Sequence, residues 1–549
     1  MRVTFLGHAG MLIETGQGSI LCDPWFSPAY FASWFPFPSN EGIDPVTVAR
    51  PDFLYVSHQH HDHFDPEFLE AAVSKDATVL LPDFPVDDLG RELRRLGFRR
   101  FERLPDREPV DLGGGLRVMG VTEVTTSDGP LGDSALAVDD GTARLLDQND
   151  ARPRDLDALA AFGSFDAHFL QFSGAIWYPV VYVLDPEVKA GLSREKRLRG
   201  MDRARRYVED VGATHVFPSA GPPCFLDRSL FGFNDFGGDD ANPFPDQTVF
   251  LEHLRSHGVE GGRLVVPGSV VDLEGGRCSV AHPGPEAEVM APFRDKRAYL
   301  EAYRERRRRV LEEAHRSWPG AGSDHPAADA GMDVVGILRE WWEPLLAKAD
   351  RLCSGIGAPV LLRAGDVAVV VDFPARRVRP FAGEDCPYRF HFQAGPFLAS
   401  VAAREQDWVN GLFLSMRFTA ERDGPYNEHL YAWFKCMSEE RLAYAEKVAP
   451  APPGAPSPSR IAPGGRRGAR RRPSGRPEDE WCEIGGWRVQ RRCPHLQADL
   501  RRFGRVEDGV LTCQMHGWQF DLATGKCLTA EDWDPIRAEP LDQARAAEG

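Results

Sequence analysis

Two groups of metal-binding side chains lie near opposite ends of this sequence. Near the amino end, four such side chains fall within six residues of the stretch VSHQHHDHFD: His58, His60, Asp62 and His63. Near the carboxyl end, a C-x-H pair and a C-x-x-H pair stand 17 residues apart: Cys493, His495, Cys513 and His516. Thiolates select zinc or iron–sulfur clusters, whereas imidazoles mixed with carboxylates also suit harder metals. The chain therefore carries two different kinds of metal chemistry.

Two thiolates and two imidazoles are also the ligands of tetrahedral zinc, but zinc ribbons usually begin with a C-x-x-C or wider spacing. The short C-x-H half, with its flanks CPHLQADL and GVLTCQMHGWQFDLATGKC, resembles the Rieske ferredoxin-type domain. The resemblance implies a [2Fe–2S] cluster in which Cys493 and Cys513 hold one iron and His495 and His516 hold the other. Neutral imidazoles raise the potential of such a cluster, which carries one electron at a time.

The amino-terminal group directly follows the expected strand FLYVS, so its side chains lie in a loop at a strand end. We expect His58 and His60 to face one metal, and Asp62 and His63 a second. The pattern H-x-H-x-D-H resembles the metallo-β-lactamase superfamily. GHAGMLIE and ILCDPWF are similar to its lactonase-like branch, and DPWFSPAYFASWFPFP is closer to the CMP-N-acetylneuraminate hydroxylases, which join the same fold to a Rieske domain in the opposite order.

The remaining ligands that the resemblance implies are left open by the sequence. A bridging carboxylate is expected at the end of RLLDQND, as Asp150 or else Asp147. Residues 64–149 contain no histidine, although the superfamily usually places one there. Asp128 or Glu123 could replace it, the latter by analogy with a diiron β-hydroxylase of this fold. A final ligand could be His215 or Asp227, and His215 fits a core strand better than a metal site.

Exchanging imidazole for carboxylate hardens a site, so the ligand set suits iron or manganese better than zinc, which has no redox couple. An electron-carrying cluster on the same chain favours dinuclear iron, with zinc or manganese as alternatives and O2 as co-substrate. We therefore predict a monooxygenase that hydroxylates or N-oxygenates a small sugar, nucleotide-sugar or natural-product substrate. A lactonase-like hydrolase, an O2 or NO reductase and a non-catalytic electron carrier are the competing hypotheses.

Strands and amphipathic helices alternate over residues 1–285, which predicts an α/β fold. The resemblance narrows this to the αβ/βα sandwich of the superfamily. Residues 286–447 read as an α+β accessory domain that opens with one highly charged helix, FRDKRAYLEAYRERRRRVLEEAHRSW, and continues with a helix at 332–352 and a hairpin at 360–381. Residues 448–479 read as a flexible linker rich in Pro, Gly and Arg, and residues 480–549 as a small β-rich Rieske domain.

The composition limits the partners. A net charge of −17 over 549 residues argues against broad affinity for nucleic acid. The sequence has no apolar run of about 18 residues and no secretory signal, so we expect a cytoplasmic protein without a membrane partner. Ten cysteines are too few for a disulfide framework. An external electron donor such as a ferredoxin or reductase is expected, and the arginine runs at 306–309 and 466–476 are candidates for docking it.

Overall fold

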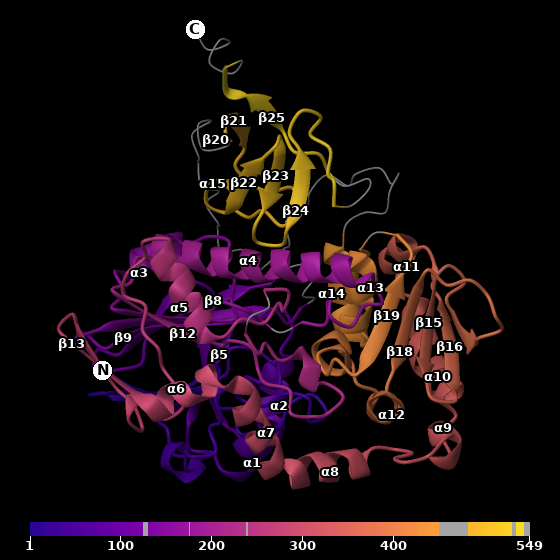
Figure 1. Cartoon of the computed structure of the whole chain (residues 1–549), viewed down its shortest axis with the longest axis horizontal. Helices are drawn as coiled ribbons and strands as arrows, with labels where there is room; N and C mark the ends of the chain where they lie inside the picture. The colour runs from indigo at the N-terminus through magenta and orange to yellow at the C-terminus, as the bar shows by residue number, and fades with distance from the viewer. Residues whose placement is uncertain are drawn as a thin grey trace.

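The computed structural model describes residues 1–124, 130–174, 176–237, 240–424, 426–449, 481–529 and 534–542. In Figure 1 the amino-terminal part, coloured indigo to magenta, lies beside the orange accessory part, and the yellow carboxyl-terminal part sits above both along helix α4. The predicted linker at 448–479 falls almost entirely outside the described residues.

Two sheets form the core of the amino-terminal domain. The first has eight strands in the order β14 (Arg277–Ala281), β13 (Val270–Glu274), β1 (Arg2–Gly7), β2 (Gly10–Thr15), β3 (Gly18–Cys22), β4 (Phe53–Tyr55), β5 (Thr78–Pro82) and β6 (Arg100–Leu104). The second has six: β12 (His215–Ser219), β11 (Ala167–Gln171), β10 (Arg144–Asn149), β9 (Asp133–Asp139), β8 (Arg117–Glu123) and β7 (Pro109–Asp111). The sheets pack face to face, since one buried cluster joins Phe5 and Tyr55 of the first to Val138 and Phe169 of the second.

Helices cover the outer faces of both sheets. Leu69 of α1 (Pro66–Ala71) and Leu93 of α2 (Asp88–Arg95) pack on Val79 of the first sheet. The second sheet is covered by α3 (Asp157–Phe162), α4 (Pro186–Val211) and α5 (Gln247–Ser256), which bury Tyr207 and Phe250. This arrangement is the predicted αβ/βα sandwich, and the fold class is confirmed.

The charged segment that we expected to form one helix is three: α6 (Glu286–Arg294), α7 (Lys296–Arg306) and α8 (Arg308–Ser317). That expectation was wrong, because the first break lies at Asp295, whose side chain accepts from Ala298 N at 3.1 Å and starts a new helix. The breaks let Leu300, Tyr303 and Leu311 pack against the aromatic cluster of the first domain. Arg306 and Arg307 of the predicted donor-docking run pair with Glu41 instead.

The accessory domain is built on a five-stranded sheet in the order β17 (Arg377–Pro380), β16 (Val367–Asp372), β15 (Pro359–Ala364), β18 (Tyr388–Phe392) and β19 (Phe418–Arg422). The segment predicted as a hairpin forms three antiparallel strands, β15, β16 and β17. The segment predicted as one helix forms α10 (Val334–Leu346) and the start of α11 (Asp350–Ile356). The other helices are α9 (Pro326–Asp329), α12 (Ala394–Ala403), α13 (Glu428–Lys435) and α14 (Glu439–Val448), with a π-helix at Val409–Phe413.

The aromatic stretch between residues 25 and 37 fastens the accessory domain to the first domain. Trp25, Tyr30 and Trp34 are buried in the same cluster as Trp342 and Trp408 of the accessory domain. Because a large apolar interface disfavours relative domain motion, these two parts form one body.

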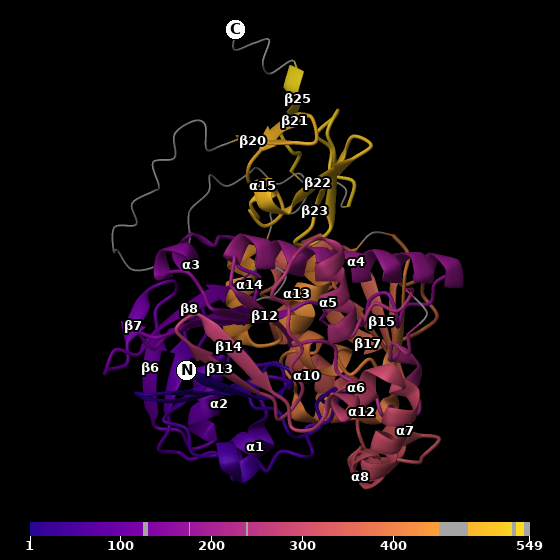
Figure 2. The ribbon, with the colours of Figure 1, turned by 60° about the vertical axis from the view of Figure 1, so that its left-hand side comes forward.

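The carboxyl-terminal module has two three-stranded sheets and one short helix, α15 (Leu500–Phe503). The first sheet consists of β20 (Trp481–Ile484), β21 (Trp487–Gln490) and β25 (Ala538–Pro540). The second consists of β22 (Gly504–Glu507), β23 (Val510–Cys513) and β24 (Trp518–Asp521). The module rests on α4 in both views (Figure 1, Figure 2). Phe503, Met515 and Trp518 share one buried cluster with Met201 and Tyr207 of α4. Within the described part of the chain, no helix is long and apolar enough to cross a membrane.

Candidate metal centres

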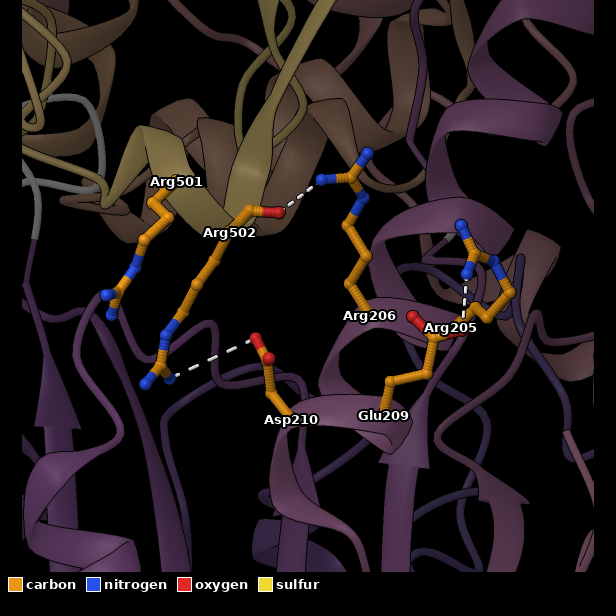
Figure 3. Close-up of a pocket in the computed structure, with 6 residues that line it drawn as sticks. All are labelled: Arg205, Arg206, Glu209, Asp210, Arg501 and Arg502. Atoms are coloured by element: carbon orange, nitrogen blue, oxygen red, sulfur yellow. Dashed lines mark hydrogen bonds and ion pairs between the residues drawn. The ribbon is translucent and has the colours of Figure 1, made fainter. Parts of the chain in front are cut away.

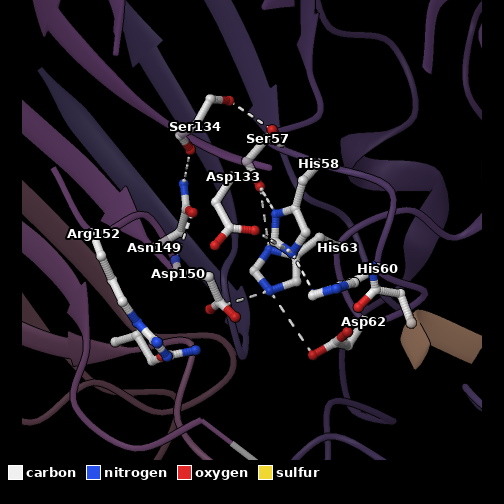
Figure 4. Close-up of polar contacts among 12 residues, drawn as sticks. Ser57, His58, His60, Asp62, His63, Asp133, Ser134, Asn149, Asp150 and Arg152 are labelled. Carbon is white, nitrogen blue, oxygen red and sulfur yellow. Dashed lines mark hydrogen bonds and ion pairs between the residues drawn. The ribbon is translucent and has the colours of Figure 1, made fainter. Parts of the chain in front are cut away.

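Several of the predicted metal ligands of the first domain meet at one edge of the sandwich. The His58–His63 loop follows β4, and Asp150 follows β10 directly. Two further side chains join them from neighbouring strands: His8, just after β1, and Asp133, at the start of β9. Figure 4 shows these side chains of the loop turned toward Asp133 and Asp150: His58, His60, Asp62 and His63.

The donor atoms fall into two groups of three. His58, His60 and Asp133 form one, and His8, His63 and Asp150 the other, with the atoms of each group within 4.8 Å of one another. In the second group, His8 Nε2, His63 Nε2 and Asp150 Oδ1 are buried. His8 Nε2 lies 2.9 Å from Asp62 Oδ2, and His63 Nε2 lies 3.4 Å from Asp150 Oδ1. Imidazole nitrogens and carboxylate oxygens thus converge on one buried point, where a cation would interact with all of them. The residues present thus fit a pair of metal ions.

Two polar contacts fix the direction of the imidazoles. Asp23 Oδ2 lies 2.8 Å from His63 Nδ1, and Ser57 Oγ lies 2.9 Å from His58 Nδ1. A carboxylate or hydroxyl on one ring nitrogen leaves the other free for a metal, as is usual for metal-binding histidines. Both rings therefore present Nε2 to the candidate centre.

A buried network ties together the backbone beside three donors. Tyr55 OH lies 2.7 Å from Ser134 Oγ, which donates to Ser57 O at 2.6 Å. Asn149 Nδ2 donates to Ser134 O at 3.0 Å (Figure 4). Ser57, Ser134 and Asn149 immediately adjoin His58, Asp133 and Asp150, so strands β4, β9 and β10 are held at the spacing that the donors need.

Burial and neighbouring charges shift the ionisation of this cluster strongly. Burial, together with His63 and His60, lowers the pKa of His58 well below its usual value, which favours the neutral form that binds metal. Burial also disfavours the charged form of His63, but Asp150 and Asp23 outweigh it and hold that pKa well above its usual value. A metal cation would take over the role of that proton beside the two carboxylates.

Asp62 and Asp147 lie in the cluster but outside the two donor groups. Asp62 accepts from Tyr30 OH at 2.8 Å, lies 2.9 Å from His8 Nε2, and stands 3.8 Å from His63 Nε2. Asp147 is fully buried, and its pKa is raised well above the usual range by burial and by Asp23. Asp150 is thus the better placed of the two carboxylates proposed as a bridge.

The other candidates occupy different places. Glu123 pairs with Arg107 and, through Oε2 at 2.7 Å, with Arg154, so both of its oxygens are engaged. Asp128 lies outside the described residues. His215 starts β12 and lies 3.3 Å from the Arg263 Nε that donates to it, and Asp227 accepts from Arg417 at 2.9 Å. The structure brings none of the described three into the donor groups.

Sequence reasoning missed His8 and Asp133. His8 stands in the quoted stretch GHAGMLIE at the end of the first strand, with a positive φ of 54° that marks a sharp turn. Asp133 directly precedes the stretch SALAVDD and is the first residue of β9, one strand before that of Asp150. A polar residue at a strand end in each stretch was the available signal.

A polar cavity of about 450 Å³ opens beside His58 and His60. Its opposite wall comes from the accessory domain, including Glu405, Asp407 and Asn410. Arg441, 2.6 Å from Asp88, joins the two walls. The lining mixes acids, arginines and amides, which suits a small polar compound that forms several hydrogen bonds.

The four carboxyl-terminal ligands converge at one end of the module. The Cys493 and Cys513 thiols are in contact, which together with burial raises the pKa of Cys493. The His495 and His516 rings lie 5.1 Å apart, and Trp518 stacks on His495 at 4.0 Å. Two adjacent sulfurs beside two adjacent imidazoles fit a [2Fe–2S] cluster held by two thiolates and two histidines.

This end of the module faces the body of the protein. Arg154 donates to Leu496 O at 3.3 Å, and Arg203 donates to Met515 O at 3.4 Å. The Tyr207 hydroxyl donates to Pro153 O at 3.0 Å and lies 3.4 Å from Met515 Sδ. The first ligand loop therefore contacts Arg154, four positions after Asp150, and the second contacts Arg203 and Tyr207 of α4.

Charged side chains surround this contact. Figure 3 shows Arg206 reaching the backbone oxygen of Arg502, and Arg502 facing Asp210 at 3.9 Å. A second rim pair joins Arg492 to Asp155 at 3.7 Å. Exposed pairs of this kind contribute little stability, so the apolar cluster on α4 dominates the docking.

Comparison with known proteins agrees with these assignments. Residues 2–131 match the beta-lactamase superfamily domain, residues 334–450 the Rv3818-like, SCP2-like domain, and residues 486–540 the Rieske [2Fe-2S] domain. A Rieske 2Fe-2S iron-sulfur protein of Mycobacterium tuberculosis, Rv3818, is 48% identical over 539 residues, which are 96% of this chain and 98% of that protein. The chain belongs to this family of Rieske 2Fe-2S iron-sulfur proteins.

Two more distant similarities concern the first domain. The cytidine monophosphate-N-acetylneuraminic acid hydroxylase of Danio rerio is 29% identical over 89 residues, which are 16% of this chain and 14% of that protein. The solved structure of CmlA, a diiron beta-hydroxylase from Streptomyces venezuelae, shares 20% identity with a TM-score of 0.34, over 51% of this chain and 54% of that chain. The resemblance to the metallo-β-lactamase superfamily and to Rieske domains is confirmed, and a [2Fe–2S] cluster is the cofactor of the carboxyl-terminal module.

Proposed function

We propose that this protein is a Rieske-coupled oxygenase, in which the carboxyl-terminal cluster supplies electrons to a dinuclear iron site in the first domain. The contact between Arg154 and the first cluster loop, at Leu496 O, supports this most directly, because Arg154 lies four residues after the bridging candidate Asp150. Electron transfer needs such a short, packed connection, whereas a zinc hydrolase has no use for one.

The chain's own residues divide the work as follows. His58, His60 and Asp133 would hold one iron, and His8, His63 and Asp150 the other, with Asp62 between His8 and His63. Dinuclear iron there would supply the redox chemistry for reaction with O2. Asp23 and Ser57 hold the imidazoles in the orientation that binds metal.

The polar cavity beside His58 and His60 is the proposed substrate site. Its mixed lining favours a small hydrophilic compound over a lipid. The similarity to the cytidine monophosphate-N-acetylneuraminic acid hydroxylase covers only 89 residues, yet the hydroxylation of a sugar nucleotide fits this substrate class. An external one-electron donor, such as a ferredoxin or reductase, would reduce the cluster.

The test uses the full-length chain loaded with iron anaerobically. Mössbauer spectroscopy should find about four irons per chain in two distinct pairs. The reduced protein is then mixed with 18O2 and a mycobacterial metabolite extract, and an organic product carrying the label is sought by mass spectrometry. A matched Cys493→Ser/Cys513→Ser variant, which lacks the cluster, should give only the turnover that its prereduced dinuclear site allows.

Two results would contradict the proposal. Zinc in the first domain, with turnover that needs no reductant, would point to a hydrolase. O2 consumption with label only in water would point to an O2 reductase.

A further inference from the structure

Glu428 buries a carboxylate in the surface on which the Rieske module rests. It is the first residue of α13 in the accessory domain, its side chain is 7% exposed, and neither oxygen has a hydrogen-bond partner within the described residues. Oε1 lies 3.5 Å from Nε2 of His495. A buried ionised carboxylate is costly without a partner, and the His495 ring is the polar group that faces it.

The charges around the module match what each faces. The arginines of the body, Arg154, Arg203 and Arg206, point at backbone oxygens of the module. Glu428 instead points at a ring nitrogen that can carry a proton. The arginines thus face hydrogen-bond acceptors and Glu428 faces a hydrogen-bond donor, so the surface of the body is electrostatically complementary to that of the module.

The orientation of the His495 ring sets which nitrogen Glu428 can use. Trp518 stacks on the ring with an angle of 15° between the planes and so fixes its plane. An imidazole that binds a metal through one nitrogen usually donates the other N–H to a carboxylate. With Nε2 directed at Glu428, Nδ1 is left for iron.

We propose that Glu428 is a positioning residue for the Rieske module, accepting the Nε2–H of His495 in the iron-loaded chain and lowering the potential of the cluster while the module is docked. Reduction adds one electron, and therefore one negative charge, to the cluster. A carboxylate in a poorly solvated interface opposes that charge. Docking thus makes the cluster a stronger one-electron donor. This inference rests on the cluster and is independent of the proposed oxygenase chemistry.

The experiment measures the midpoint potential of the full-length, iron-loaded protein by EPR during a dithionite titration with mediators at one fixed pH. Glu428→Gln keeps the shape and removes the charge. We expect its reduced-to-oxidised ratio at a given ambient potential to rise about tenfold, which is about 59 mV for one electron. The matched control is Asp155→Asn, which removes a charge from the same interface beside Arg492, where both side chains are about 40% exposed.

Glu428→Asp keeps the charge but moves it away by one methylene. Its midpoint potential should lie between those of the wild type and Glu428→Gln. Hydrogen exchange at the 493–496 loop reports docking separately and should be faster in Glu428→Gln than in Asp155→Asn. A potential and exchange rate in Glu428→Gln equal to those of the wild type would overturn the proposal. An equal shift in Asp155→Asn would overturn it as well, since any interface charge would then serve.

Discussion

Asp23 offers the sharpest test of how the first metal centre is held. Its Oδ1 accepts from Ser57 N at 2.7 Å, and its Oδ2 accepts from Ser57 Oγ at 2.6 Å and lies 2.8 Å from His63 Nδ1. In Asp23→Asn one oxygen becomes an NH2 group, so a donor must face either Ser57 N or His63. Losing one such buried contact costs about 1–3 kcal/mol of stability. Losing the partner of a metal-binding histidine costs about 10–100-fold in metal affinity.

Asp65 provides a control of the same chemistry. It is buried at the N-cap of α1, and its two oxygens accept three backbone N–H groups, those of Phe26, Ser27 and Phe68, at 2.7–2.9 Å. Asp65→Asn should lose similar stability but no metal affinity, because Asp65 contacts no candidate ligand through these bonds.

The assay is iron retained per chain against increasing chelator, with cluster iron counted separately by EPR and stability followed by thermal unfolding. Asp23→Asn should release the iron of the first domain at a chelator concentration about 10–100-fold lower than the wild type. Equal iron retention in the wild type and Asp23→Asn would refute the argument. So would an equal loss in Asp65→Asn, because general destabilisation would then explain the release.

Three further predictions concern single side chains. Asp133→Asn should lower the iron content of the first domain by about one atom per chain in metal analysis. Glu123→Gln should leave the iron content unchanged and should instead speed hydrogen exchange at Leu496. Iron loss in Glu123→Gln alone would reverse the ligand assignment. Burial raises the pKa of Glu405 to about 7. The folded state therefore binds more protons than the unfolded state between about pH 4.3 and 7, and wild-type stability falls as pH rises through that window. Glu405→Gln should raise the melting temperature at pH 8 but hardly at pH 5, and an equal increase at both pH values would exclude this cause. Burial opposes the ionisation of Asp227, but Arg417 holds its pKa at about 2. Asp227 therefore stabilises the fold above the unfolded pKa of about 3.9, and this contribution is lost as pH falls toward 2. Asp227→Asn should lower the unfolding free energy by about 3–5 kcal/mol at pH 7, because buried Arg417 loses its counter-charge, and a change below about 1 kcal/mol would contradict this.

The ligands that the sequence predicted well are those encoded locally. His58, His60 and His63 share one loop, and the Cys-x-His and Cys-x-x-His pairs each share one turn, so their spacing in sequence is nearly their arrangement in space. The strands beneath them are equally local, because alternating apolar residues mark a strand wherever they occur. The αβ/βα sandwich could therefore be predicted from patterning and resemblance.

The ligands that the sequence missed depend on strand order. His8 and Asp133 lie in the first and the second sheet, and only the packing of the two sheets brings them to the loop after β4. Glu123 looked suitable because it also ends a strand of the second sheet, but Arg107 and Arg154 neutralise it there. No local pattern reveals an arginine that arrives from 31 residues away.

The docked module also changes how the two centres can work together. A flexible linker would let the cluster move between an external donor and the first domain, yet the cluster end of the module shares an apolar core with α4. Undocking would expose Phe503, Met515 and Tyr207 to water, at roughly 1.5–3 kcal/mol for each large side chain. We therefore infer that the docked arrangement delivers the electron. Residues 150–154 then connect the two candidate centres, since Asp150 lies in one group of candidate metal ligands and Arg154 donates to Leu496 O of the module.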